Sequence, residues 1–353
     1  VQVSEVKYFN EYAFFFAKYC DLIPISMIKV SVIVHTYKHE NYIRQTLDSI
    51  VNQQVNFEYE VIVGDDASPD STPDIIREYQ QKYPHLIKPL LHPVNLGGFG
   101  KNNTMATLAE AKGQYIAPMD GDDYWTSPHK LQKQVDFLDA NPDFVACFHN
   151  ALIHFEDGSH PDEYVNTPEQ KVVTTLDDLV GEDEVWYMAT SAVMFRHGIM
   201  KTYPQWFHES KSGDIPRYIL LGKHGKFYYM NDVMSVYRKN GGGMSFTDGK
   251  QDAEFLFNRI GMYKGIDQEL DFRFHTRVRK NIARYYLMLA NSIQYGDNPI
   301  LSRYYALKSL VLSRPNKPEH LKKVMMTYVI PHRVMGIYAN VKWQLMKIVG
   351  RAK

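Results

Sequence analysis

Cysteine is scarce in this chain of 353 residues, and neither sign of charge is in excess. The two cysteines, Cys20 and Cys147, are far apart and lack metal-site spacing, which argues against a disulfide framework and against a zinc site. Lys and Arg total 40, as do Asp and Glu, which argues against nucleic acid as a bulk partner. The sequence therefore predicts a protein of a reducing, cytoplasmic compartment that does not bind nucleic acid.

Long apolar runs are also missing. No stretch approaches the roughly 20 apolar residues of a membrane-spanning helix. The aromatic segment at 12–19 contains Lys18 and lacks the basic start and the cleavage site of a signal peptide. Residues 1–26 differ in character from the rest of the chain, and two alternatives stay open for them: an upstream extension, or a genuine first helix.

The chain does have a regular alternation of apolar runs and helical patterns. Four runs predict buried strands, at 30–34, 59–63, 87–91 and 115–119. Segments with apolar residues at helical spacing separate these runs, and another such segment comes after the last run. This order is typical of an α/β fold with a doubly wound, mostly parallel sheet.

Beyond residue 140 the pattern changes twice. Strands are expected at 144–155, 186–195 and 226–237, with a helix at 215–221. From residue 252 the pattern is helical, up to a proline-containing break at 313–318. The expected divisions are an N-terminal extension at 1–26, an α/β domain at 27–250, a helical extension at 251–315 and a basic amphipathic tail at 316–353.

Three carboxylates within four residues come directly after the run at 115–119: Asp120, Asp122 and Asp123. They would repel one another unless a cation lies among them. Mn²⁺ or Mg²⁺ with oxygen ligands meets that need and usually keeps substrate phosphates in its shell. The alternative is an acidic turn that caps the next helix. Ligands bind at the carboxyl ends of parallel strands, so the position favours a metal and ligand site.

A second acidic strand end is formed by Asp65 and Asp66, which come after the run at 59–63. Carboxylates there can accept hydrogen bonds from a base N–H or from ribose hydroxyls. The alternative is a solvated turn, suggested by the segment at 68–71. Two acidic strand ends at one edge of the sheet favour a binding site over two unrelated turns.

Several segments occur in order and at suitable intervals: 32–37, 61–68, 95–97, 115–123, 212–214 and 237–238. Together they resemble the family 2 glycosyltransferases, bacterial sugar-nucleotide enzymes with the GT-A fold. The resemblance covers roughly residues 28–246 and implies an α/β fold of the GT-A type with a C-terminal helical extension. The motifs are specific for the family but say little about which sugar is moved.

The resemblance implies roles by position. The residues that would hold the nucleoside are Thr36, Tyr37, Asp65 and Asp66. Asp120 and Asp122 form the family's aspartate-any-aspartate motif, with Asp122 the expected direct ligand of a diphosphate-bound metal. Asp214 matches the catalytic base.

Further donor-binding positions come from the same resemblance. Asn95 and Gly97 belong to the glycine segment. Many relatives carry an arginine where this chain has Asn102, and two alternatives stay open: Lys101 supplies the positive charge instead, or the phosphates rely on the metal and the backbone. Arg238 and the loop at 241–245 match a flexible segment that closes over the donor.

Transfer of a sugar from a nucleotide requires a metal site and a base, which these residues could provide. A departing nucleotide diphosphate is an anion, and a metal offsets its charge. One positioned carboxylate can take the proton of an acceptor hydroxyl, and a single base without an enzymic nucleophile implies inversion at the anomeric carbon. We expect an inverting, metal-dependent transfer from a UDP-sugar to a glycan or lipid-linked acceptor in cell-surface polysaccharide synthesis. Trp125 is expected on the acceptor side.

Three alternatives remain at this point. A nucleotidyltransferase shares the sheet and the acidic site, but residues 36–39 offer no phosphate loop rich in glycine and arginine. A catalytically silent sugar-nucleotide-binding subunit would have no reason to place a carboxylate at Asp214. Asp214 itself could instead be the N-cap of a helix that begins at Ile215.

The C-terminal tail is basic and amphipathic. No acidic residue occurs after Glu319, and apolar residues recur at helical spacing between 334 and 348. A basic amphipathic helix is typical of a membrane-surface element, which predicts peripheral contact with the inner membrane leaflet. The alternative is a terminal helix that docks on the protein.

Overall fold

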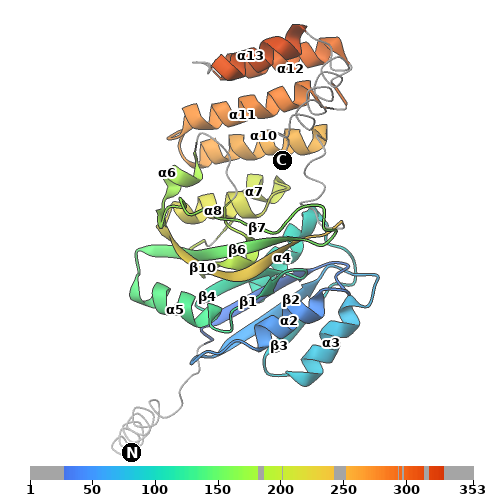
Figure 1. Ribbon diagram of the computed structural model, residues 1–353, viewed down its shortest axis with the longest axis vertical. Coiled ribbons are helices and arrows are strands. Elements are labelled where there is room, and N and C mark those ends of the chain that lie inside the picture. The colour runs from blue at the N-terminus through green and yellow to red at the C-terminus, as the bar shows by residue number, and fades with distance from the viewer. Residues whose placement is uncertain are drawn as a thin grey trace, which may run out of the picture.

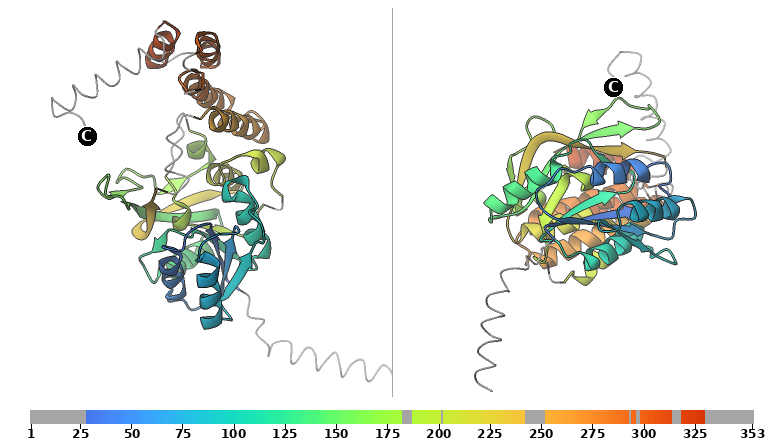
Figure 2. Two further views of the ribbon diagram at one scale, coloured as in Figure 1. Left: turned by 90° about the vertical axis from the view of Figure 1, so that its right-hand side faces the viewer. Right: turned by 90° about the horizontal axis from the view of Figure 1, so that it is seen from below.

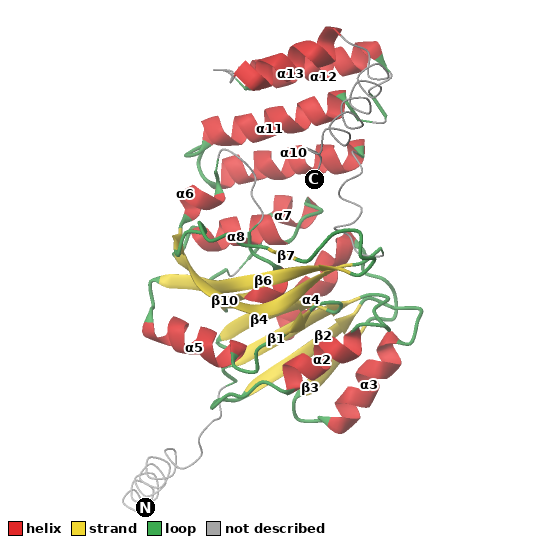
Figure 3. Ribbon diagram, viewed as in Figure 1, coloured by secondary structure: helices red, strands yellow, loops and turns green. Residues whose placement is uncertain are grey.

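The described chain is a curled α/β layer followed by a stack of helices (Figures 1 and 3). The computed structural model describes residues 28–181, 187–200, 202–241, 252–292, 294–295, 298–313 and 318–329. The expected N-terminal extension, most of the loop at 241–245 and the tail beyond 329 lie outside these residues. The sequence-based expectations for those segments stay predictions.

The sheet has a parallel half and a mixed half, in the strand order β3-β2-β1-β4-β9-β6-β10-β5. The parallel half consists of β1 (Val30–Thr36), β2 (Tyr59–Asp65), β3 (Ile87–Leu91) and β4 (Tyr115–Asp120). The short strand β9 (Val193–Arg196) runs antiparallel to both of its neighbours, β4 and β6 (Phe144–Phe155). Strand β10 (Lys226–Lys239) then continues the sheet parallel to β6.

Three two-residue strands complete the sheet. The strand β5 (Tyr124–Trp125) pairs with β10 directly after the acidic turn at the end of β4. The others are β7 (Glu163–Tyr164), which pairs with β6, and β8 (Val173–Thr174), which pairs with β10.

Helices cover both faces of the parallel half because successive residues of a buried strand point to opposite faces. Val32 and Val34 pack with α2 (Ile43–Val51), α3 (Thr72–Lys82) and α5 (Lys130–Ala140). Ile33 and Ile62 belong to a second core cluster on the other face, which includes Leu108 of α4 (Lys101–Glu110) and Tyr218 of α8 (Asp214–Gly222). The α/β class with a mostly parallel, doubly wound sheet is confirmed.

The expected strand at 186–195 is wrong for most of its length. A 3₁₀ turn, η3 (Thr190–Ala192), precedes β9, and residues 187–189 are neither helix nor strand. Side chains take over the backbone hydrogen bonds there: Trp125 Nε1 donates to the Ser191 carbonyl at 2.8 Å, and Gln134 Nε2 donates to the Ala192 carbonyl at 3.0 Å. With its carbonyls satisfied in this way, the segment needs no strand partner.

The C-terminal helices form successive layers that lead away from the sheet (Figures 1 and 2). They are α10 (Ala253–Glu269), α11 (His275–Ala290), α12 (Pro299–Leu312) and α13 (Pro318–Val329). The first layer packs on α6 (Leu176–Leu179), α7 (Gln205–Glu209) and α8, and a Cβ added at Gly265 would lie 2.4 Å from Trp206 Cγ. Within the described residues no helix is long and apolar enough to cross a bilayer.

Lys130 is a fully buried cation at the start of α5. Its Nζ lies 4.1 Å from the centroid of the Trp125 ring and has no hydrogen-bond partner within the described part of the chain. Burial lowers the pKa of the Lys130 ammonium from 10.5 to about 7. The folded state therefore releases a proton that the unfolded chain keeps up to about pH 10. The free energy of unfolding should rise between pH 7 and pH 10.

Replacing Lys130 with Met should raise the melting temperature at pH 7, because each unit of lowered pKa corresponds to about 1.4 kcal/mol of destabilisation. The gain should shrink as the pH rises toward 10, because deprotonating the amine costs less free energy as the pH approaches its unfolded-state pKa. Thermal melts of both proteins at pH 7 and pH 9.5 would measure this. Lys133→Met, which removes an exposed ion pair with Asp232, is the matched control and should show no such pH dependence. A gain for Lys130→Met that is equal at both pH values would contradict the prediction.

Candidate functional site

The two acidic strand ends lie at one edge of the sheet, on either side of the end of β1. In the pairing of β1 with β4, His35 is opposite Asp120, and in the pairing of β1 with β2, Thr36 is opposite Asp65. The turn after β4 also folds back on β1, since the Gly121 amide donates to the His35 carbonyl at 2.8 Å. A Cβ added at Gly121 would lie 2.7 Å from both His39 Nδ1 and Thr36 Cβ. Glycine is therefore required where this turn touches β1.

Asp120, Asp122 and Asp214 form a cluster of carboxylates. The Thr190 hydroxyl donates to Asp214 Oδ2 at 3.1 Å, and its hydrogen bonding also favours the ionised form of Asp120. Burial, and then the charges of Asp122 and Asp214, nevertheless raise the pKa of Asp120 to about 8. The negative charge of the cluster is therefore only partly compensated by the protein.

Asp214 does not act as a helix N-cap. It is the first residue of α8, the cap position is Gly213, and no side chain there makes a capping hydrogen bond. Its carboxylate, about one third exposed, accepts from Thr190 instead. The structure thus removes the capping alternative and brings Asp214, far away in sequence, to the acidic turn.

Arg217 is a charged group of this cluster that the sequence analysis missed. Its side chain is almost fully buried, and its Nη1 lies 3.9 Å from Asp214 Oδ1, one helical turn away on α8. Its charge also lowers the pKa of His35, which burial drives to about 3, so that this histidine is neutral. The signal that could have shown Arg217 is the spacing of an acid and a base three residues apart on a predicted helix.

Asp122 and Asp123 are held in place by β10. Asn240 Nδ2 donates to Asp122 Oδ2 at 2.7 Å, and the Arg238 amide donates to Asp123 Oδ1 at 2.9 Å. His39 completes the surroundings of Asp122, with Nε2 3.9 Å from Asp122 Oδ2. Neither His39 nor Asn240 was predicted as a member of the site, although both come shortly after the end of a strand, β1 and β10.

The Arg238 side chain contacts the acidic turn and residues around it, and its expected role in closing over the donor stays a prediction. Nε donates to the Asp122 carbonyl at 2.6 Å, Nη2 donates to Gln45 at 2.6 Å, and Nη1 pairs with Glu156. The guanidinium also lies 5.0 Å from the centroids of the Tyr42 and Tyr124 rings. Arg238 therefore fastens the acidic turn to its surroundings.

The predicted nucleoside residues lie at the neighbouring strand ends. Asp66 Oδ1 accepts from the Leu96 amide at 2.6 Å, and Asn95 Nδ2 donates to the Asp66 carbonyl at 2.9 Å. Asn95 in turn accepts from the Gly97 amide at 2.9 Å. The structure therefore brings Asp66, directly after β2, together with Asn95 and Gly97 in the loop after β3.

Asp65 closes a turn with Ser68, but it is buried rather than solvated, and its predicted role in holding the nucleoside stays a prediction. Oδ2 accepts from the Ser68 amide at 2.9 Å and Oδ1 from the Ser68 hydroxyl at 2.5 Å. Thr36 and Tyr37 are different, because the buried Thr36 hydroxyl has no partner within the described ranges and the Tyr37 ring is largely exposed. Both offer unused contact groups beside the acidic turn.

Two predicted assignments need correction. Lys101 is buried, and its ammonium donates to the carbonyls of Phe207 (2.7 Å), His208 and Ser210 at the end of α7, so it is already engaged. Trp125 is also buried, in the core beneath the acidic turn, with its indole N–H bonded to Ser191. Neither side chain is placed to contact a phosphate or an acceptor.

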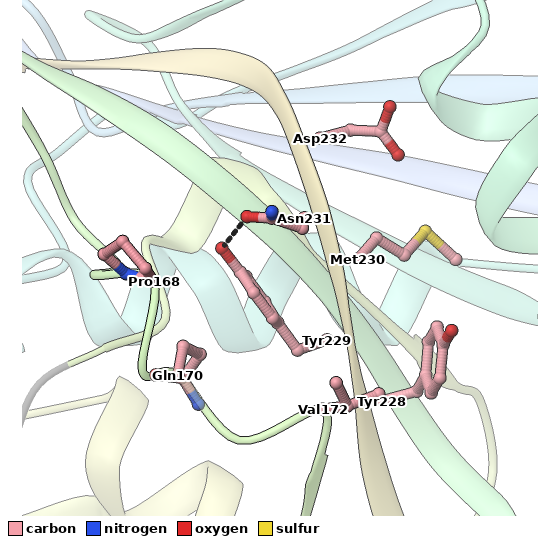
Figure 4. A pocket seen from close by; sticks show the side chains of 8 residues that line it. All are labelled: Pro168, Gln170, Val172, Tyr228, Tyr229, Met230, Asn231 and Asp232. Atoms are coloured by element: carbon pink, nitrogen blue, oxygen red, sulfur yellow. Dashed lines mark hydrogen bonds between the residues drawn. The ribbon is translucent and has the colours of Figure 1, made fainter.

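A hollow of about 330 Å³ lies on a different part of β10 (Figure 4). Its lining comes from residues 168–172 and 228–232, and Tyr229 donates to Asn231 Oδ1 across it at 3.1 Å. None of the predicted site residues lines this hollow.

The acidic turn could hold a divalent cation, although the protein alone does not supply a full set of ligands. Among the residues that the structure describes, no group of three or more His, Cys, Asp or Glu side chains is arranged to hold a metal ion. Asp120 and Asp122 offer carboxylate oxygens in a cluster with uncompensated negative charge. Mg²⁺ and Mn²⁺ accept such a pair when water and substrate phosphates complete the shell, so the donor set fits a metal that arrives with a diphosphate.

Comparison with known proteins gives consistent results. The family model for glycosyl transferase family 2 matches residues 31–203. An uncharacterized protein of Mycobacterium bovis is 33% identical over 265 residues, which are 72% of this chain and 71% of that protein. A poly(ribitol-phosphate) beta-glucosyltransferase of Bacillus spizizenii is 41% identical over 98 residues, or 28% of this chain and 15% of that enzyme.

Among solved structures, TarS 1–349 of Staphylococcus aureus in complex with UDP is similar at a TM-score of 0.46 and 18% identity. The likeness covers 81% of this chain and 89% of that one.

Proposed function

Because the chain belongs to glycosyl transferase family 2, we propose that it transfers a sugar from a UDP-sugar to a glycan or lipid-linked acceptor at the cluster of Asp120, Asp122 and Asp214. The proposal rests on one observation: a carboxylate on α8 shares Thr190 with the acidic turn at the end of β4. This arrangement supports a site in which Asp214 faces the acceptor beside a nucleotide diphosphate.

The donor would lie along the carboxyl ends of β1, β2 and β4. Thr36, Tyr37 and Asp66 have contact groups at the nucleoside end of this edge, and Asp120 and Asp122 stand at the diphosphate end. A Mn²⁺ or Mg²⁺ ion held by Asp122 and Asp120 would, when bound, offset the negative charge of the leaving diphosphate. Asn240, His39 and Arg238 keep the Asp122 carboxylate and its loop in place.

Asp214 is proposed as the general base. Its carboxylate takes the proton of the acceptor hydroxyl while the acceptor oxygen bonds to the anomeric carbon. The bond from that carbon to the diphosphate oxygen breaks, and the nucleotide leaves with the electron pair. One displacement inverts the anomeric centre. Thr190 and Arg217 would orient the Asp214 carboxylate.

The proposals for the acceptor and for the cellular location are inferred from the amino-acid sequence and from one relative. The relative from Bacillus spizizenii is named for a poly(ribitol-phosphate) acceptor, which agrees with a role of this chain in cell-surface polysaccharide synthesis. A cytoplasmic enzyme of that kind would meet a lipid-linked acceptor at the inner leaflet. The basic tail at 316–353 is proposed to bring it there.

A thermal-shift screen of nucleotides tests the donor assignment. UDP with Mn²⁺ should raise the melting temperature more than ADP, GDP or CDP does, because a ligand that binds only the folded state stabilises it. At a concentration about 100 times its dissociation constant, the stabilisation should be about 2.7 kcal/mol. UDP without the metal should give a smaller shift. An equal shift from every nucleotide would remove the UDP assignment.

A further inference from the structure

Helix α12 packs inward through Tyr305, Leu310 and Leu312, but it also carries large apolar side chains on its outer face. Ile300, Tyr304, Leu307 and Val311 recur at helical spacing, and their exposure runs from 48% for Tyr304 and Val311 to 78% for Ile300. A surface helix normally turns such a stripe toward the core. A contiguous set of exposed large apolar side chains marks an interaction surface.

The orientation of α12 is fixed by polar contacts on the opposite face. Ser302 Oγ donates to the Ala290 carbonyl at 2.7 Å, and Ser309 Oγ donates to the Ala283 carbonyl at 2.6 Å, both on α11. Ala306 lies between them and is fully buried. Small residues therefore bring α12 close to α11. A rotation that buried the apolar stripe would break both hydrogen bonds and wedge large side chains into a space fitted to serine and alanine.

Helix α13 extends the same surface. It packs inward through Val324 and Thr327, and the Thr327 hydroxyl accepts from Asn291 Nδ2 at 3.2 Å. Its exposed apolar residues, each at least 41% exposed, are Leu321, Met325, Tyr328 and Val329. Arg303 Nε of α12 donates to the Tyr328 carbonyl at 3.3 Å, which ties the two helices together. They form the outermost layer of the molecule, farthest from the parallel strands (Figures 1 and 2).

We propose that this α12–α13 face, formed by Ile300, Tyr304, Leu307, Val311, Leu321, Met325, Tyr328 and Val329, lies against the surface of an anionic lipid bilayer. The net positive charge of α12 and α13 indicates an anionic partner for this face. The two helices contain the basic residues Arg303, Lys308, Lys322 and Lys323, and their single acidic residue is Glu319. Apolar and aromatic side chains bordered by lysine and arginine fit a headgroup layer, where the apolar groups enter and the cations meet phosphates.

A second copy of this chain suits the face less well. In a two-fold interface the same patch occurs on both sides, so each basic residue would approach those of the partner patch. Anionic headgroups carry the opposite charge. The face overlaps the start of the basic tail in α13, but it also includes α12, which precedes the tail, and it does not include the apolar stripe predicted between 334 and 348.

Vesicle sedimentation with the full-length chain tests the proposal in the absence of nucleotide or acceptor, so that the result does not depend on the transfer reaction. The probe is a set of liposomes containing about 30% phosphatidylglycerol in phosphatidylcholine, compared with pure phosphatidylcholine. The wild type should sediment with the anionic vesicles, and the bound fraction should fall with added salt. The triple variant Ile300→Ser, Leu307→Ser, Met325→Ser should bind at least about tenfold more weakly, because buried apolar area contributes to interfacial binding.

The matched control replaces two exposed apolar residues elsewhere, Val94→Ser and Phe272→Ser, and should bind like the wild type. Melting temperatures of both variants should stay near that of the wild type, since the replaced side chains are exposed. The proposal is overturned if the triple variant binds vesicles as well as the wild type does. It is also overturned if the wild type is a dimer by light scattering that the triple variant dissociates, or if the variant melts at a lower temperature with vesicle binding unchanged. Those results would assign the face to a second copy or to the tail of the same chain.

Discussion

Replacing Asp214 with Asn should lower the rate of sugar transfer at least about a hundredfold, the usual scale for loss of a general base. Asparagine keeps the size of the side chain and an oxygen that can still accept from the Thr190 hydroxyl. It cannot take a proton from the acceptor. Binding of UDP with Mn²⁺ should therefore be unchanged, and the loss should appear in kcat, measured by UDP release with a soluble acceptor.

The control for this experiment is Glu209→Gln. Glu209 is the nearest other carboxylate in sequence, but it is exposed at the end of α7 and accepts from Gln205 at 2.8 Å. Its replacement should leave turnover within about twofold of the wild type, since surface groups outside a site rarely matter. If Asp214→Asn retained full activity while Glu209→Gln lost it, Glu209 would be the base. If both variants bound UDP and the wild type itself transferred nothing, the chain would be a silent binding subunit.

The acidic edge of the sheet could be predicted from the sequence because it depends on local patterns. The runs that became β3 and β6 were predicted with the same bounds that the structure shows, and the parallel order of the first strands is a consequence of the intervening helices. Once β1, β2 and β4 are parallel neighbours, their carboxyl ends must coincide. The placement of Asp66 and Asp120 at one edge of the sheet therefore required no knowledge of side-chain packing.

The fate of individual side chains could not be predicted in the same way. Lys101 and Trp125 are close in sequence to motifs of the predicted site. Their hydrogen-bond partners, however, are carbonyls of α7 and η3, which are distant from them in sequence. A sequence pattern indicates that a residue is near a site, whereas burial depends on which distant segment covers it. For the same reason the buried Arg217 and the β10 contacts of Asp122 became visible only in three dimensions.

Replacing Asp122 with Ala should abolish the metal-dependent part of UDP binding. The physical reason is the loss of one of the two carboxylates at the proposed diphosphate end of the site. In the wild type, Asn240 Nδ2 donates to Asp122 Oδ2 at 2.7 Å and so holds that carboxylate in place. Loss of even an outer-shell partner typically weakens metal affinity about 10–100-fold, so removal of a direct ligand should cost at least that much. Titration calorimetry of UDP in the presence and absence of Mn²⁺ would measure it.

The fold should survive this replacement, because the turn is anchored by groups that Asp122→Ala leaves intact. The Arg238 guanidinium binds the backbone carbonyl of residue 122, and the Arg238 amide binds Asp123. Asp162→Ala, which removes an exposed carboxylate paired with His154, is the matched control and should bind UDP and Mn²⁺ like the wild type. Unchanged metal-dependent binding in Asp122→Ala, with a normal melting temperature, would show that the acidic turn serves only to shape the chain between β4 and β5.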